Sequence, residues 1–215
     1  LRVPVYCTPF TAGMLEAKKV SEHNAPDIPV TVFRAGEPFK VGPFEVEGVH
    51  VTHSIPEPVS LMIRSPLGNI IHTGDWKLDR EPTLGQTTDE AHFRRLGKEG
   101  VLALVCDSTN AMREGVSPSE EDVSESLAEV IDSAPGRVII TTFSSNVGRI
   151  RSIALAAAPG ASLRPKSLSA SKRAIAIFVA TSVMPGILPS VVLSWSLTRP
   201  PMAAGLLRSI DSLRW

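Results

Sequence analysis

Two residues in the first half of the chain have the side chains and the positions expected of metal ligands. His53 follows an apolar, alternating stretch and precedes a proline-containing turn, and Asp75 follows a second apolar stretch and a glycine. Ligands in sheet proteins commonly lie on loops just past strand ends, where the backbone is fixed and the side chain faces a cleft. The two residues therefore predict a metal site, with a purely structural histidine at a strand end as the alternative.

The donor atoms of these two side chains indicate which chemistry such a site could perform. An imidazole nitrogen and a carboxylate oxygen suit zinc or manganese, and one carboxylate can bridge two ions. Two bridged metal ions can deprotonate a water at neutral pH and hold a phosphodiester for in-line attack. His53 and Asp75 are therefore compatible with hydrolysis of a phosphodiester bond.

Four short motifs follow one another along the first three quarters of the chain. They are HSIPE at residues 53–57, HTGDWK at 72–77, CDSTNA at 106–111 and TFSSN at 142–146. Their order and spacing, from about residue 1 to residue 157, resemble successive motifs of the ribonuclease J family, in the β-CASP group of metallo-β-lactamase-fold ribonucleases. The resemblance implies an α/β fold, a partial metallo-β-lactamase αβ/βα sandwich with the start of a β-CASP α/β insertion.

The resemblance also implies roles for individual residues. His53 matches the metal-binding histidine of the third lactamase motif, and Asp75 matches the acid that bridges the two metal ions. His72 is not a ligand in the family. Asp107 matches the acid at the start of the β-CASP insertion, where it supports the catalytic site by hydrogen bonding; the alternative is a helix or turn cap. Asp75 and Asp107 are thus the expected catalytic residues.

Small polar residues in the last motif are the expected substrate-binding group. Ser144, Ser145 and Asn146 follow an apolar stretch and precede a helix-like one, so their backbone amides and side chains could hold an RNA phosphate. The alternative is an ordinary helix cap by Ser144 or Ser145. Arg149 could add positive charge nearby, although a solvated arginine is the default interpretation.

The activity implied by the resemblance is hydrolysis of RNA, both endonucleolytically and from a 5′-monophosphate end. Two zinc ions are the expected cofactors of a complete enzyme, with manganese as an alternative. RNA is the expected partner, together with further copies of the chain in a homo-oligomer. We expect a cytoplasmic location and no membrane partner.

One principal motif of the family is missing, because the string His-x-His-x-Asp-His occurs nowhere in the sequence. Two ligands cannot complete a dinuclear site, so the chain as it stands is predicted to be inactive. Two alternatives remain. One is another metallo-β-lactamase-fold hydrolase acting on small esters or thioesters, against which the motifs near Asp107 and Asn146 argue. The other is a non-catalytic remnant of the fold.

Local patterns predict the elements that must position these residues. Thr8 and Pro9 indicate a helix start, Gly48 interrupts an alternating strand and indicates a bulge, and residues 65–68 indicate a hairpin turn. Residues 101–106 and 138–142 are continuous apolar runs typical of buried strands. Other strands are expected at 3–7, 30–34, 44–52, 59–64 and 69–73, and helices at 8–21, 89–98 (ended by Gly100), 119–132 and from 147 onward.

The charge distribution changes sharply along the chain. Residues 1–150 carry a net charge of −7 and residues 151–215 a net charge of +7. Residues 174–197 contain no charged side chain, which allows a membrane span, but Pro185, Gly186 and Pro189 argue against one. We expect three parts: residues 1–105 from the C-terminal part of the first metallo-β-lactamase half, 106–157 from the start of the β-CASP domain, and an unmatched, possibly frame-shifted tail at 158–215.

Overall fold

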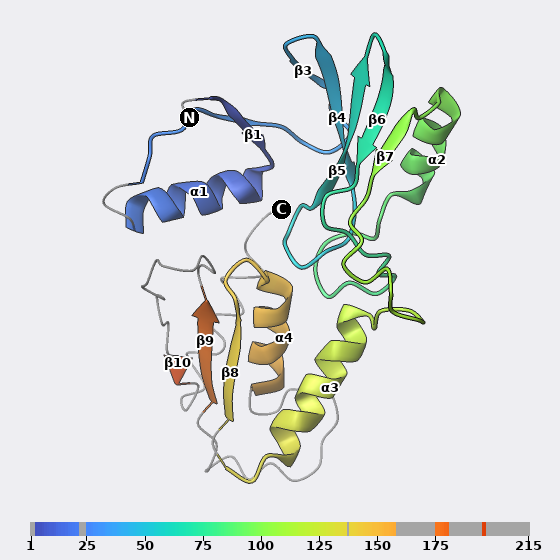
Figure 1. The fold of residues 1–215 in the computed structure, drawn as a ribbon. Coiled ribbons are helices and arrows are strands. Elements are labelled where there is room, and N and C mark those ends of the chain that lie inside the picture. Colours follow the sequence, from blue (N-terminus) through green and yellow to red (C-terminus); the bar gives the residue numbers. More distant parts are fainter. Residues whose placement is uncertain (1–2, 22–24, 137, 158–174, 181–194, 197–215) are drawn as a thin grey trace. The chain divides into compact units, whose positions relative to one another are not determined.

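The computed structural model describes residues 3–21, 25–136, 138–157, 175–180 and 195–196. After Ser117 the chain passes from one compact unit into a second, which begins at Pro118 (Figure 1). Both units combine helices with β-sheets, so the α/β class predicted from the sequence is confirmed. The expected boundaries after residues 105 and 157 stay predictions drawn from the family resemblance.

A five-stranded sheet is the main element of the first unit. The strand order is β3-β4-β5-β6-β7, and neighbours are antiparallel except for the parallel pair β6 and β7. The strands β4, β6 and β7 therefore run in the same direction and end at the same edge of the sheet. Their bounds are β3 (Phe39–Val41), β4 (Phe44–His50), β5 (Val59–Ser65), β6 (Gly68–His72) and β7 (Ala103–Val105).

A tight hairpin joins β5 to β6, as predicted from the sequence. Ser65 pairs with Gly68 across the turn, and the Ser65 hydroxyl donates a hydrogen bond to the Gly68 carbonyl at 2.8 Å. Gly68 has a φ of 136°, a backbone conformation that residues other than glycine rarely adopt. The hairpin fixes the register that places Leu61 opposite His72.

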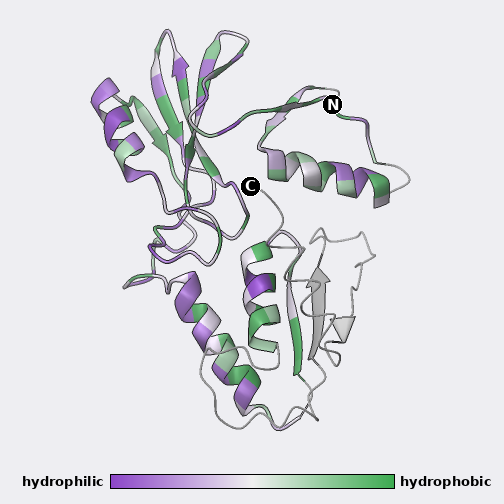
Figure 2. Cartoon of the chain, turned by 180° about the vertical axis from the view of Figure 1, so that it is seen from behind, coloured by the Kyte–Doolittle hydropathy of each residue, from purple (hydrophilic) through white to green (hydrophobic). Residues whose placement is uncertain are grey.

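Helix α2 (Glu90–Glu99) packs on one face of the sheet and buries the core of this unit. Met62 and Leu96 are completely buried and pack together with Val49 and Ile71. Alternate side chains of a strand share a face, so the register that aligns Met62 with Ile71 carries this apolar row across the sheet. Most of α2 is hydrophilic in Figure 2, consistent with a narrow apolar stripe that faces the sheet.

Both ends of α2 are fixed by capping residues. Asp89 accepts a hydrogen bond from the backbone amide of His92 at 2.9 Å, and Gly100 follows the last turn with a φ of 92°. These are the helix start and the terminating glycine that the sequence predicted.

A network of charged side chains lies between α2 and the sheet. The buried Glu47 carboxylate lies 2.7 Å from His92 Nε2 and 2.8 Å from Arg64 Nη2. Arg64 also donates to Glu99 at 3.0 Å, and this contact holds the pKa of Glu99 below its ordinary value. Arg64 therefore pairs with one oxygen of the buried carboxylate, a condition under which burial of charge is tolerated, whereas Nε2 of His92 lies close to the other oxygen without the geometry of a hydrogen bond.

The bulge predicted at Gly48 is wrong. Strand β4 pairs with β5 without interruption, from Glu45 opposite Arg64 to His50 opposite Val59. A Cβ built on Gly48 would lie 2.9 Å from Cε2 of Phe33, whose ring packs over this position. The glycine is thus needed because an aromatic ring from a distant segment approaches the strand closely, which local alternation cannot reveal.

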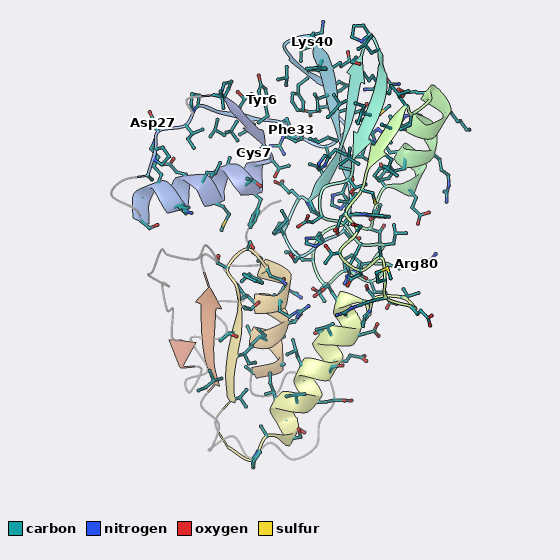
Figure 3. The ribbon with its side chains drawn as sticks, in the orientation of Figure 1. Tyr6, Cys7, Asp27, Phe33, Lys40 and Arg80 are labelled. Carbon is teal, nitrogen blue, oxygen red and sulfur yellow. The ribbon has the colours of Figure 1, made fainter. Side chains whose placement is uncertain are left out.

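A small β-α-β module precedes the sheet. It consists of β1 (Val5–Cys7), α1 (Pro9–Ser21) and β2 (Val30–Val32), with β1 and β2 parallel. Phe39 of β3 stacks on Tyr6 and on Phe33, with ring centroids 5.2 Å and 4.6 Å apart, which joins the module to the sheet; Figure 3 labels Tyr6 and Phe33. The helix begins at Pro9 as predicted, but the Thr8 hydroxyl contacts the Thr11 hydroxyl at 3.3 Å rather than a backbone amide.

Strand β7 is exposed, contrary to the prediction of a buried strand. Leu104 is 61% exposed and Val105 is 50% exposed, and no described strand lies beyond β7 at this edge of the sheet. The apolar run of residues 101–106 correctly indicated a strand. Its burial depends on neighbours that the described residues do not supply.

The second unit is built from two helices and a three-stranded sheet of order β10-β9-β8. Ile131 of α3 and Ile153 of α4 form its buried centre. Ser119 begins α3 with a capping box to Asp122, which confirms the predicted start. The elements are α3 (Glu120–Ser133), β8 (Val138–Phe143), α4 (Val147–Ala157), β9 (Ile175–Ala180) and β10 (Trp195–Ser196).

Strand β8 is only half-buried, with Ile139 67% and Phe143 59% exposed, so its predicted full burial is wrong. Strand β9 pairs parallel to β8 and falls inside the uncharged stretch of residues 174–197. A strand there is incompatible with one continuous helix through that stretch. Within the described ranges, no helix combines the length and the apolar character that crossing a bilayer requires. The remainder of residues 158–215 lies outside the described residues.

We predict opposite effects for two glycine-to-alanine substitutions. Gly48→Ala forces the Phe33 ring to shift and should lower the free energy of unfolding by about 1–3 kcal/mol. Gly13→Ala, in a helix with no atom within 4 Å of the new methyl group, should raise it by about 0.5–1 kcal/mol. Urea unfolding of both variants checks this, and a Gly48→Ala variant as stable as the parent would contradict the close contact.

Candidate metal centre

The His53 loop connects β4 to β5 at the edge where β4, β6 and β7 end (Figure 1). The amide of Val51 donates to the carbonyl of Pro58 at 3.1 Å and closes the loop at its base. The His53 ring is half-buried, and its Nδ1 lies 3.2 Å from the Ser54 hydroxyl. A hydrogen bond at Nδ1 fixes the orientation of the ring, as neighbours of metal-binding histidines commonly do.

Thr52, directly before His53, anchors the loop to the segment that follows β6. Its amide donates to the Thr88 hydroxyl at 3.0 Å, and its own hydroxyl accepts from the amide of Asp79 at 3.1 Å and donates to the carbonyl of Lys77. The side chain of Thr52 is 4% exposed, so these bonds are shielded from water. Sequence reasoning missed this residue, although its position next to His53 was the available signal.

Asp75 lies on the loop after β6 and is exposed. Gly74 before it has a φ of 61°, which glycine adopts readily, and its amide donates to Nδ1 of His72 at 3.1 Å. The His72 nitrogen is therefore occupied as an acceptor, which favours the structural interpretation of His72 over a ligand role.

Thr73 links the Asp75 loop to the loop that carries Asp107. The Thr73 hydroxyl accepts a hydrogen bond from the amide of Asp107 at 3.0 Å and donates to the carbonyl of Gly74 at 2.8 Å. The Thr73 carbonyl in turn accepts from the buried hydroxyl of Ser60 at 2.8 Å. Two loops that are more than thirty residues apart in sequence are thus held together by one buried threonine, which the motif comparison had not singled out.

The Asp107 carboxylate is held ionised by its neighbours. It accepts from the Thr109 hydroxyl at 2.6 Å and from the Thr109 amide at 2.9 Å. These two bonds lower the pKa of Asp107, and the positive charge of His53 lowers it further. Among the described residues, the contact that links Asp107 to another predicted loop is its backbone hydrogen bond to Thr73, which precedes the Asp75 loop.

The described residues contain no group of three histidine, cysteine, aspartate or glutamate side chains placed to hold a metal ion. The donor chemistry of His53, Asp75 and Asp107 fits zinc or manganese, because imidazole and carboxylate are their common ligands. The number of donors does not fit a closed site, for which zinc commonly needs at least three protein ligands.

A pocket of about 380 Å³ opens beside this edge of the sheet. Thr73 and Cys106 contribute to its wall from the ends of β6 and β7, and Trp76 and Phe93 supply aromatic surface. Its lining is overwhelmingly apolar, so the pocket differs in character from the polar loops of His53 and Asp107.

In the second unit, Ser144, Ser145 and Asn146 follow β8 and precede α4. Asn146 caps the helix, because its Oδ1 accepts from the amide of Arg149 at 3.0 Å. The alternative considered from the sequence, a cap by Ser144 or Ser145, is therefore wrong, because Asn146 supplies the cap. Arg149 forms a bidentate ion pair with Glu120, with a shortest distance of 2.9 Å, so its charge is neutralised within this unit.

Three bacterial proteins named Ribonuclease J are similar to this chain. The Sinorhizobium meliloti protein is 67% identical over 157 residues, which is 73% of this chain and 28% of that protein. The Thermus thermophilus protein is 40% identical over 162 residues, and the Mycobacterium tuberculosis H37Rv protein 41% over 151 residues, covering 72% and 70% of this chain. Each of these two alignments covers 27% of the relative. The chain thus spans little more than a quarter of the relatives it matches.

A solved structure shares the fold. The crystal structure of a protein of unknown function from Enterococcus faecalis V583 matches with a TM-score of 0.54 and 22% identity, covering 70% of this chain and 39% of that one. No protein-family profile matches the chain. The curated relatives and the α/β structure are consistent with the partial metallo-β-lactamase fold that the motifs implied.

We predict that Thr109→Val raises the pKa of Asp107 toward its ordinary value, because the strongest hydrogen bond to the carboxylate is lost. Thr109→Ser keeps the hydroxyl and should leave the pKa low. The ionised carboxylate stabilises the fold above the pKa of the unfolded chain, and this contribution disappears as pH falls through the folded pKa. Carboxyl carbon chemical shifts measured against pH check the prediction, and an unchanged pKa in Thr109→Val contradicts it.

Proposed function

The chain belongs to the ribonuclease J family, and on that premise we propose that it provides part of the metal-binding edge of an enzyme that hydrolyses RNA phosphodiester bonds. The observation that supports this most directly is the alignment of β4, β6 and β7. Their ends carry His53, Asp75 and Asp107 on three loops at one edge of one sheet. Loops at a common edge are where a rigid scaffold concentrates functional side chains.

In this proposal His53 and Asp75 are the residues that would hold metal, and zinc is the expected element. Bound zinc would lower the pKa of a coordinated water and polarise the phosphate of the substrate. Asp107 would support the site by hydrogen bonding, and the Thr109 hydrogen bonds favour its charged form. The Thr73 hydroxyl holds the Asp107 loop beside the Asp75 loop, because it hydrogen-bonds to the amide of Asp107 and to the carbonyl of Gly74.

Ser144 and Ser145 would contact an RNA phosphate through backbone amides and hydroxyls, and Asn146 through its side-chain nitrogen, because the Asn146 backbone amide donates to the carbonyl of Phe143 at 3.1 Å. The Asn146 side chain already caps α4, so its carbonyl oxygen is committed to the helix. The same proposal includes RNA as the substrate, which would be cleaved both internally and from a 5′-monophosphate end. It also includes assembly of the protein into a homo-oligomer. Since the described residues hold too few clustered ligands, we expect this chain by itself to bind zinc weakly and to be inactive.

The proposed ligands can be tested in a hybrid protein. In this hybrid, residues of this chain replace the matching segment of the Sinorhizobium meliloti ribonuclease J. His53→Ala and Asp75→Ala in the hybrid should each reduce cleavage of 5′-monophosphorylated RNA by at least about 100-fold and lower the bound zinc. His50→Ala is the matched control for the histidine, because its Nε2 contacts only the exposed carbonyl of Gln86 among the described residues. Asp27→Ala, on an exposed ion pair with Lys19, is the control for the aspartate.

The outcomes separate the alternatives. Full cleavage by Asp75→Ala would remove this residue from the metal site. A hybrid that folds but binds neither zinc nor manganese would favour the non-catalytic remnant. Hydrolysis of small esters without cleavage of RNA would favour another metallo-β-lactamase-fold hydrolase.

A further inference from the structure

We infer that Glu57 is a positioning residue: its carboxylate clamps the His53 loop to the amino-terminal end of helix α1. The inference rests on the proposed metal role of His53 and assigns a function to a residue that the metal chemistry itself does not use. It follows from one long-range hydrogen bond, the backbone conformation of Glu57, and the way the loop is closed.

The hydrogen bond joins two segments that are distant in sequence. Oε2 of Glu57 accepts from the backbone amide of Phe10 at 2.7 Å, across 47 residues. Phe10 is in the first turn of α1, where backbone amides have no partner within the helix and the helix dipole favours negative charge. The first turn of α1 contains no acidic residue, so Glu57 supplies the carboxylate from another loop.

The backbone of Glu57 adopts a conformation that is unfavourable for a residue other than glycine. Glu57 has a φ of 55°, and it is the only residue other than glycine with a positive φ among those described. It also precedes Pro58, whose ring restricts the conformations of the residue before it. Such a conformation persists where surrounding contacts fix it, and such sites concentrate where geometry matters for function.

The loop transmits the position of Glu57 to His53. The bond from the Val51 amide to the Pro58 carbonyl closes the loop, and Pro56 and Pro58 are both buried. Only three residues separate His53 from Glu57 within this closed segment. Release of the Glu57 carboxylate from α1 would therefore remove one of the contacts that hold the loop and let His53 change its position.

We predict that three substitutions in the full 215-residue chain distinguish the clamp from a simple stabilising contact. Glu57→Gln keeps an oxygen acceptor, Glu57→Ala removes it, and Glu57→Gly removes it while relieving the positive φ. Amide hydrogen exchange at Phe10 and Ser54 reports the clamp, and zinc chloride titration followed by the His53 ring resonances reports the proposed ligand. Thr8→Val is the matched control, because it removes a side-chain contact at the start of α1 without touching the loop.

Glu57→Ala and Glu57→Gly should speed exchange at Phe10 and Ser54 and weaken zinc binding at His53 by about tenfold, the loss typical of an outer contact to a metal ligand. Glu57→Gln should remain within about threefold of the parent, and Thr8→Val should leave zinc binding unchanged. Unchanged exchange in Glu57→Ala, parental zinc binding in Glu57→Gly, or an equal loss in Thr8→Val would each overturn the inference. If the parent shows no zinc-dependent shift of His53, the proposed metal role fails, and the exchange rates alone decide whether Glu57 is the clamp.

Discussion

The packing of α2 on the five-stranded sheet is the contact on which the rest of the first unit depends. Met62 and Leu96 lose all contact with water there, and a buried side chain of this size contributes about 1.5–3 kcal/mol. This packing fixes the face of each strand and hence its register, since a slip by one residue would turn every side chain to the opposite face. With the register fixed, the ends of β4, β6 and β7 fall at one edge, and the polar loops meet there.

The Glu47, His92 and Arg64 network adds specificity to that contact rather than much stability. Bringing charges out of water costs free energy, which good geometry only offsets. Here Arg64 of the sheet pairs with Glu99 of α2, and His92 of α2 lies beside Glu47 of the sheet, so these contacts favour one orientation of the helix. The apolar row supplies the attraction, and the charged network selects the orientation.

The sequence was most informative where structure is determined locally. Gly100 ends α2, Ser119 starts α3, and residues 65–68 form the hairpin, because each signal acts within a few residues of itself. Burial of β7 and the conformation around Gly48 were predicted wrongly, since both depend on segments distant in sequence.

The same distinction applies to the candidate centre. The types and spacing of His53 and Asp75 indicated metal chemistry, and the resemblance to the family predicted a supporting role for Asp107. Thr52, Thr73 and Glu57 support them through contacts spanning 25 to 47 residues, which a linear reading does not show.

The edge strand β7 has a consequence for how long such a chain would persist in a cell. Within the described part of the chain β7 is the last strand at its edge, and its backbone together with the exposed Leu104 and Val105 offers a template on which another extended segment can add. Self-association through this strand depends on the concentration of the protein. The lifetime of the monomer would therefore depend on how fast another molecule binds to β7. Dilution, or a chaperone that masks the strand, would therefore slow its loss by self-association.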